Sequence, residues 1–207
     1  MNFEEEINRY EKLQFNSDYV IKTGNVPILF TAVHTMNQSK DDKTIKFMES
    51  YTKAIAFYLN NYANVSCIVK IKDTGYDSNK DNHDEFKYEL IKFVKENNIR
   101  LVIDLHGSKR KRAYDIEFGT LNNLSADYST IKELEESFIE NGIKNIIHNN
   151  PFKGGAITQY LFNLKNVDVI QLEINQKFRD SNNISNLELL CKSLINFINY
   201  YNNKINE

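Results

Sequence analysis

Side chains that are able to do chemistry stand at the ends of three apolar runs. The run 100–103 leads into Asp104 and His106, the run 26–33 leads into His34, and the run 167–172 leads into Glu173. Runs of this kind are typical of buried strands, and ligands of α/β proteins bind where parallel strands end. An Asp two residues before a His can orient the imidazole and leave its other ring nitrogen for a metal ion.

Two strand-end histidines indicate a mononuclear zinc site, which needs about three protein ligands and an open position. For the third ligand we favour Glu49, which stands at the start of a predicted helix over 47–60. The apolar stripe of that helix uses positions 47, 48, 51, 54 and 55 and leaves Glu49 aside. Asp41 and Asp42 are alternative ligands, because their loop can fold inward. An ordinary hydrogen-bonded strand-end histidine is the alternative interpretation of His34.

Glu173 closes an apolar strand, where burial of an unpaired carboxylate is costly. Beside a metal ion, such a carboxylate can serve as a general base. The alternative is a salt bridge at the end of the strand.

Two further segments are candidates for substrate binding. In the first, 149–155, Lys153 precedes the adjacent glycines Gly154 and Gly155. This pattern predicts a tight loop with backbone amides available to an anion, although a plain turn also explains it. The second is the basic run 109–112, in which Arg110 or Arg112 is placed to attract an acidic substrate.

Elements predicted from periodicity and turn residues alternate between strand and helix. The predicted strands are 19–23, 26–33, 65–71, 101–105, 114–118, 143–148 and 167–174, and the predicted helices are 47–60, 84–97, 131–141, 157–163 and 187–201. This alternation predicts one α/β domain over 1–207, with three α/β/α layers around a mostly parallel mixed sheet. The long polar loops mostly follow strands and would gather at one edge of the sheet.

Composition narrows the class of protein. The net charge is −2, so the chain lacks the overall positive charge that would attract nucleic acid or an anionic membrane. No stretch reaches the ~20 apolar residues of a membrane span. The acidic N-terminus lacks the pattern of a signal peptide, so we expect a cytoplasmic protein. Cys67 and Cys191 have no metal-ligand spacing and are predicted to be buried thiols.

Taken together, these segments resemble the N-formylglutamate amidohydrolase family, which shares the wider zinc carboxypeptidase and aspartoacylase-like fold. The resemblance rests on seven segments that occur in the same order as in that family and span about 26–178. They are the His34 strand, 46–52, 76–79, 103–107, 114–119, 150–155 and 171–175. It implies a zinc-exopeptidase-like fold and a zinc-dependent amide hydrolase. In the wider fold two histidines and an acidic residue hold the metal, which corresponds here to His34, Glu49 and His106.

The resemblance also implies a role for Glu173, which corresponds to a glutamate that promotes attack by water. Two positions depart from the wider fold. Asn37 stands where an acidic ligand is often found, and Asn79-Lys80 replaces an Asn-Arg pair that grips the substrate carboxylate. Lysine offers a single point charge, whereas arginine binds a carboxylate through two parallel N–H donors.

The sequence thus predicts a zinc-dependent amidohydrolase that cleaves a small N-formyl or N-acyl amino acid such as N-formylglutamate. Its substrate would be an acidic small molecule. Lys153, Asn79 or a basic residue near 110–112 would hold the substrate carboxylate or the developing oxyanion, with Lys153 as a candidate catalytic residue and Lys80 as a further candidate for substrate binding. A peptidase or poly-glutamate hydrolase on the same fold is one alternative. A non-catalytic binding protein is the other.

Overall fold

The computed structural model describes residues 2–39, 44–80, 84–164 and 166–206. Its strands are β1 (Tyr19–Lys22), β2 (Val26–Ala32), β3 (Gln38–Ser39), β4 (Ile45–Lys46), β5 (Val65–Lys70), β6 (Leu101–Ser108), β7 (Ile116–Gly119), β8 (Ile146–His148) and β9 (Asp168–Asn175). Its α-helices are α1 (Phe3–Lys12), α2 (Thr52–Ala63), α3 (Glu85–Glu96), α4 (Tyr128–Glu140), α5 (Ala156–Phe162) and α6 (Ile184–Asn206).

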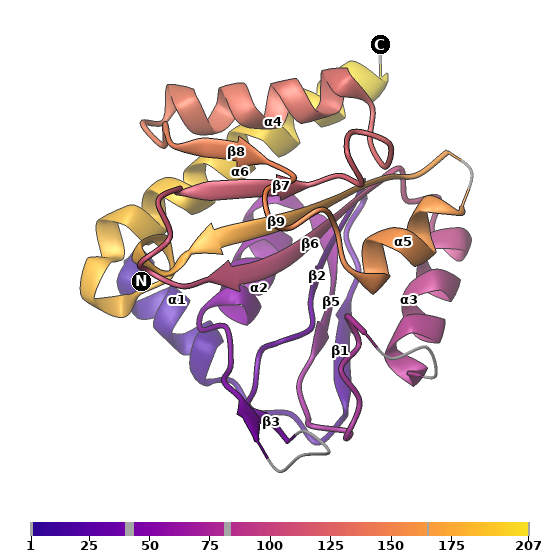
Figure 1. Ribbon diagram of the computed structural model, residues 1–207, viewed down its shortest axis with the longest axis vertical. Helices are drawn as coiled ribbons and strands as arrows, with labels where there is room; N and C mark the ends of the chain where they lie inside the picture. The colour runs from indigo at the N-terminus through magenta and orange to yellow at the C-terminus, as the bar shows by residue number, and fades with distance from the viewer. Residues whose placement is uncertain (1, 40–43, 81–83, 165, 207) are drawn as a thin grey trace.

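A seven-stranded sheet in the order β1-β5-β2-β6-β9-β7-β8 forms the centre of the described structure (Figure 1). β2 pairs in parallel with β5 and β6, β6 pairs in parallel with β9, and β7 pairs in parallel with β8. Within the described part of this sheet the β1–β5 and β7–β9 pairs are antiparallel, and β3 and β4 form a separate antiparallel pair. The predicted mostly parallel mixed sheet is therefore confirmed.

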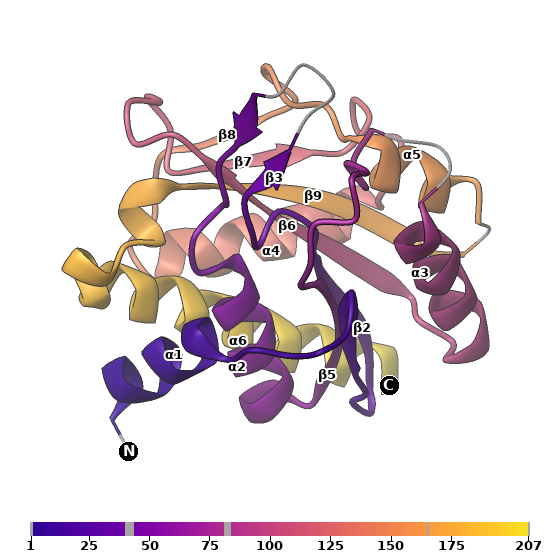
Figure 2. The ribbon, with the colours of Figure 1, turned by 90° about the horizontal axis from the view of Figure 1, so that it is seen from below.

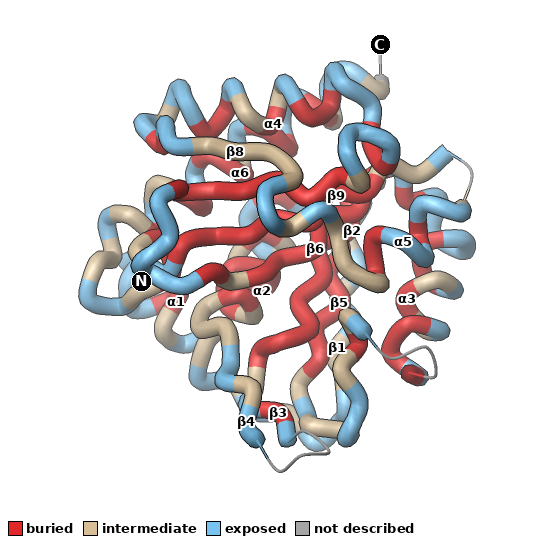
Figure 3. Tube along the Cα trace, viewed as in Figure 1, coloured by how far each residue is buried: buried red, intermediate tan, exposed pale blue. Residues whose placement is uncertain are grey.

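Helices cover both faces of the sheet, which gives the three predicted layers. α3 and α5 lie on one face, and α1, α2, α4 and α6 lie on the other (Figures 1 and 2). Strand residues alternate between the two cores, since Ile28 and Phe30 pack on the α2 and α6 side while Leu29 packs against α3. Figure 3 shows buried residues along the strands and exposed residues on the outer faces of the helices.

The topology places the candidate site at one edge of the sheet. β2, β6 and β9 are neighbours and run parallel, so their carboxyl ends meet at the same edge. His34 follows β2, and β6 and β9 carry His106 and Glu173 directly opposite each other. The sheet order thus brings together three groups that the chain separates widely.

Two predictions of local structure are wrong beside this edge. The predicted helix over 47–60 begins only at Thr52, because Tyr51 has a left-handed backbone with φ of 66°. Phe47, expected on the apolar stripe of that helix, is 76% exposed. Strands β3 and β4 and helix α1 were not predicted; α1 begins with an Asn2 and Glu5 capping box.

Candidate metal centre

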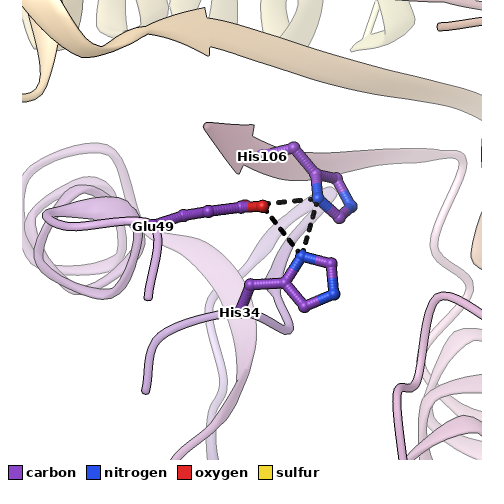
Figure 4. Close-up of side chains that lie close together, drawn as sticks. All are labelled: His34, Glu49 and His106. Carbon is purple, nitrogen blue, oxygen red and sulfur yellow. Dashed lines mark hydrogen bonds and ion pairs between the residues drawn. The ribbon is translucent and has the colours of Figure 1, made fainter. Parts of the chain in front are cut away.

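Three side chains converge at the carboxyl edge of the sheet (Figure 4). The Nδ1 atoms of His34 and His106 lie 3.2 Å apart. Glu49 Oε1 lies 3.0 Å from His34 Nδ1, and Glu49 Oε2 lies 3.3 Å from His106 Nδ1. One ligand atom from each residue falls within 4.8 Å of the other two. The structure therefore brings together the three predicted ligands.

Glu49 reaches this position from an irregular segment between β4 and α2, which corrects its predicted place at the start of a helix. Its amide N–H donates to the His34 carbonyl at 2.7 Å, so the segment lies against the end of β2. The Gly107 N–H donates to Glu49 Oε2 at 2.9 Å. Thr52 Oγ1 bonds the Glu49 carbonyl at 2.8 Å, where α2 begins. Backbone contacts on both sides thus orient the carboxylate toward the histidines. The alternative ligands Asp41 and Asp42 lie outside the described residues.

Each histidine has an aspartate on its other ring nitrogen. Asp104 Oδ2 lies 2.9 Å from His106 Nε2, as the Asp-x-His spacing predicted. Asp77 Oδ1 lies 2.9 Å from His34 Nε2, a contact that was not predicted because turn formation alone explains the Asp77 segment. An aspartate that accepts from Nε2–H fixes the ring and leaves the Nδ1 lone pair directed at the centre.

Lys46 is a second residue of the site that was not predicted. It comes from β4, and its Nζ lies 2.6 Å from His34 Nε2 and 3.3 Å from Asp77 Oδ2. Lys46 donates to Nε2 only when that nitrogen is unprotonated, whereas Asp77 accepts from it only when it is protonated. The two partners therefore compete for one atom of His34.

The carboxylates of Asp77, Asp104 and Glu49 contact the two histidines, together with the Lys46 ammonium. Burial favours the neutral form of Glu49, but the adjacent His34 and His106 outweigh it and hold the pKa of Glu49 well below its usual range. Burial opposes the charged form of His106, but Asp104 and Glu49 outweigh it and raise the pKa of His106 well above its usual value. Glu49 is thus ionised at neutral pH, and the position between the rings favours a cation.

The donor set fits a divalent transition metal. Ligand atoms 2.0–2.1 Å from a tetrahedral ion lie about 3.3 Å from one another. The Nδ1–Nδ1 distance of 3.2 Å is close to that value, and the two Nδ1 atoms lie 3.0 and 3.3 Å from different oxygens of the Glu49 carboxylate. Two imidazole nitrogens and one carboxylate, each with an outer hydrogen-bond partner, form a typical catalytic zinc set.

Glu173 lies beside this set. It is 5% exposed and stands opposite His106 in the β6–β9 pair. Burial is the main cause that raises the pKa of Glu173, and the nearby Glu49 adds to it while His106 opposes it. Among the described residues Glu173 makes no ion pair with a lysine or arginine, so no salt bridge of the kind considered as an alternative is present there.

An open cavity of about 570 Å³ lies over the centre. Its lining includes the predicted ligands and Glu173 together with the predicted substrate residues Asn79, Lys80, Lys153, Gly154 and Gly155. Arg110 and Arg112 are not in this lining. Arg110 pairs with Asp180, and the Arg112 guanidinium lies 5.4 Å from the ring centre of Phe152, which does line the cavity.

The 149–155 loop forms one wall of the cavity, and its amides are partly engaged. The Gly155 N–H donates to Gln171 Oε1 at 2.6 Å, and the Phe152 N–H donates to Glu117 Oε1 at 2.7 Å. The expectation that the Gly155 amide is available to an anion is therefore wrong. Lys153 is exposed at the rim. Gln171 and Glu117 were not predicted, and only the strand pairing that aligns them with the loop reveals them.

Comparisons with known proteins show what the chain is similar to in sequence and in fold. Residues 80–178 match the family described as N-formylglutamate amidohydrolase. An N-formylglutamate amidohydrolase from Ralstonia eutropha JMP134 has a similar structure, with a TM-score of 0.71 and 12% identity over 90% of this chain and 98% of that chain. Gene product Atu2144 from Agrobacterium tumefaciens is similar at a TM-score of 0.63 and 12% identity, over 93% of this chain and 97% of that chain.

A third similar structure is a bacteriophage poly-gamma-glutamate hydrolase. Its TM-score is 0.55 at 13% identity, over 88% of each chain. No curated protein sequence matches the chain.

The resemblance to the N-formylglutamate amidohydrolase family is thus confirmed. The sequence match to the family extends over residues 80–178. The family match supports an amidohydrolase-like function, and the similar structures show a shared α/β fold. The matched segment contains His106, Lys153 and Glu173, while His34 and Glu49 lie before it. Among the described helices, none has the length and apolar character needed to span a membrane.

Proposed function

We propose that this chain is a zinc-dependent amidohydrolase that cleaves the amide of a small N-formyl or N-acyl amino acid such as N-formylglutamate. The observation that carries the proposal is the convergence of His34, Glu49 and His106 beside the buried Glu173. We further propose a single zinc-hydrolase-like domain over 1–207 that works in the cytoplasm.

His34 and His106, through Nδ1, and Glu49, through its carboxylate, are the residues that would hold zinc. A zinc ion bound there would polarise the amide carbonyl and lower the pKa of water. Asp104 and Asp77 keep the imidazoles in the orientation that ligation needs, because each faces Nε2.

Glu173 is the proposed general base. It takes a proton from the water that attacks the amide carbonyl, and it then delivers that proton to the leaving nitrogen as the C–N bond breaks. Its raised pKa suits both transfers, because a base that works near neutral pH must also release its proton.

The substrate carboxylate is proposed to bind at the rim of the cavity. Lys80 and Lys153 carry positive charge there from two different loops, and the Asn79 side chain lies 3.4 Å from His106 Nε2. Gly155 gives Asn79 room, since a Cβ at that position would lie 2.0 Å from Asn79 Oδ1. This charge pattern favours acidic amino-acid derivatives.

Hydrolysis of a longer acidic chain, such as a γ-glutamyl polymer, is the second candidate. The specific observation is that the cavity is open and that both rim lysines, Lys80 and Lys153, are exposed. An extended chain could therefore cross the site without displacing an element of the fold.

A substrate panel tests the proposal. Zinc-loaded protein is assayed with N-formylglutamate, other N-formyl and N-acetyl amino acids, and γ-glutamyl peptides. We expect fastest turnover of an N-formyl or N-acyl acidic amino acid, and no turnover by His106→Ala, which controls for contaminating hydrolases. Preference for the peptides would favour the second candidate. Zinc-loaded wild-type protein that hydrolyses nothing in the panel would favour a binding protein.

A further inference from the structure

Gln171 links the wall of the cavity to the proposed base. Its Oε1 accepts from the Gly155 N–H at 2.6 Å, and its Nε2 donates to Glu173 Oε1 at 2.9 Å. The side chain is 2% exposed. Gln171 and Glu173 are two positions apart on β9, so both side chains leave the same face of the sheet.

These two partners leave only one orientation for the Gln171 amide. A backbone N–H requires an acceptor and an ionised carboxylate requires a donor, and a glutamine amide has one oxygen and one NH₂ group. An apolar side chain would leave the Gly155 N–H without this acceptor. A second carboxylate would accept from Gly155 but would repel Glu173 when ionised.

Neighbouring strands hold the 149–155 loop against Gln171. Gly119 pairs with Gln171 in the β7–β9 ladder, and a Cβ at Gly119 would lie 2.7 Å from the Gly154 nitrogen. Glu117 pairs with Glu173 in the same ladder and accepts from the Phe152 N–H. The loop is thus held at Phe152 and at Gly155, on either side of Lys153.

We propose that Gln171 is a positioning residue that couples the conformation of the 149–155 loop to the orientation of the Glu173 carboxylate. This inference rests on the proposed function, in which Lys153 contacts the substrate and Glu173 moves the proton. Contact between substrate and loop is then passed through Gly155 and Gln171 to Glu173. In this way, binding energy from the part of the substrate that contacts the loop helps to orient Glu173 for proton transfer.

Two variants separate the two hydrogen bonds. Gln171→Met removes both, and Gln171→Glu keeps the acceptor for Gly155 but removes the donor to Glu173. Thr158→Val is the matched control, because Thr158 is also buried against the loop and its hydroxyl has no hydrogen-bond partner among the described residues. Zinc content, kcat, KM and hydrogen exchange of the Gly155 amide are measured for each at pH 8.

We expect kcat of Gln171→Met to fall about 10- to 100-fold, a range typical of misplaced catalytic groups, with zinc retained. Gly155 should exchange faster in Gln171→Met and near the wild-type rate in Gln171→Glu, although kcat falls in both. KM should change less than kcat, and Thr158→Val should match wild type. Gln171→Met with kcat within twofold of wild type, or with unchanged Gly155 exchange, would overturn the coupling.

A failure of the proposed function gives a different result. Zinc-loaded wild-type protein would then hydrolyse no amide in the panel, whatever residue occupies position 171. In that case Gly155 exchange and the ¹³C chemical shift of the Glu173 carboxyl group decide the role of Gln171. We expect both to change in Gln171→Met, and no change in either would refute the inference.

Discussion

The Nδ1 atoms of His34 and His106 face each other at 3.2 Å, although 72 positions separate the residues in the chain. Asp104 lies against Nε2 of His106, while Asp77 and Lys46 both lie against Nε2 of His34. When each Nε2–H donates to the neighbouring aspartate, the two Nδ1 lone pairs point into one space and repel each other unless a proton or a cation lies between them. With Glu49 as the third neighbour, a divalent cation bound there would satisfy all three groups.

The first prediction is one divalent metal ion per chain, most favourably zinc. Elemental analysis of protein prepared without chelator should find it, and His34→Ala and His106→Ala should lack it. Chelation should lower the melting temperature, because a metal that binds only the folded state stabilises that state. Absence of stoichiometric metal after zinc supplementation would exclude the metalloenzyme.

The second prediction concerns the carboxylate ligand. Glu49→Gln should lower zinc affinity more than Asp41→Asn or Asp42→Asn, because Glu49 contacts both histidines. Competition with a chromophoric chelator measures all three variants. If an aspartate variant loses zinc while Glu49→Gln keeps it, the ligand assignment is wrong.

The third prediction concerns the partners of the histidines. Asp104→Asn and Asp77→Asn should each weaken zinc binding about 10- to 100-fold, since loss of an outer partner lowers ligand basicity and frees the ring. Asp73→Asn is the control, because Asp73 is in the loop of Asp77 but bonds Ser39 and Gly75 amides instead of a histidine. The same chelator competition should show the difference. Wild-type affinity in Asp104→Asn would mean that His106 needs no orienting group.

The fourth prediction concerns Glu173. Glu173→Gln keeps the size of the side chain but cannot take a proton, so we expect a fall in kcat of roughly 10²-fold or more with zinc retained. Turnover of the best substrate and metal content are measured on the same samples. Near-normal turnover in zinc-loaded Glu173→Gln would exclude the general-base role.

The pH profile of the same two proteins tests Glu173 independently. Burial raises the pKa of Glu173, so the carboxylate is active above that raised pKa and is protonated below it. Activity of wild type should therefore fall on the acidic side at a pH above the ordinary glutamate pKa of about 4.3. The residual activity of Glu173→Gln should lack this acidic limb, with metal content checked at each pH.

The fifth prediction concerns the loop that carries Asp77. Lys70 is 1% exposed, donates to the Tyr76 carbonyl and Ser78 Oγ, and lies 3.7 Å from Asp84 Oδ2. Lys70→Met should lower the free energy of unfolding by about 3–5 kcal/mol, because it leaves a buried carboxylate without its partner. Chemical denaturation measures this change. The control is Lys72→Met, which removes an exposed pair with Asp18 and should cost much less.

The sequence by itself determined the features that depend on neighbours along the chain. Alternation in strands and the helical period identified most of the sheet and its layers, because burial imposes those periods locally. The Asp104–His106 contact followed from a two-residue spacing on one strand. The ends of three apolar runs located His34, His106 and Glu173, since parallel strands end at one edge.

Only the tertiary structure decided which distant groups meet. The irregular segment at Glu49 is held by hydrogen bonds to His34, after β2, and to Gly107 in β6, whereas the local apolar pattern favoured a helix. Asp77 and Lys46 reach His34 from segments whose sequences show only turns and a two-residue strand. Gln171 meets Gly155 because β9 lies beside β7 in the sheet. Contacts of this kind arise from strand order and loop closure, and no local spacing encodes them.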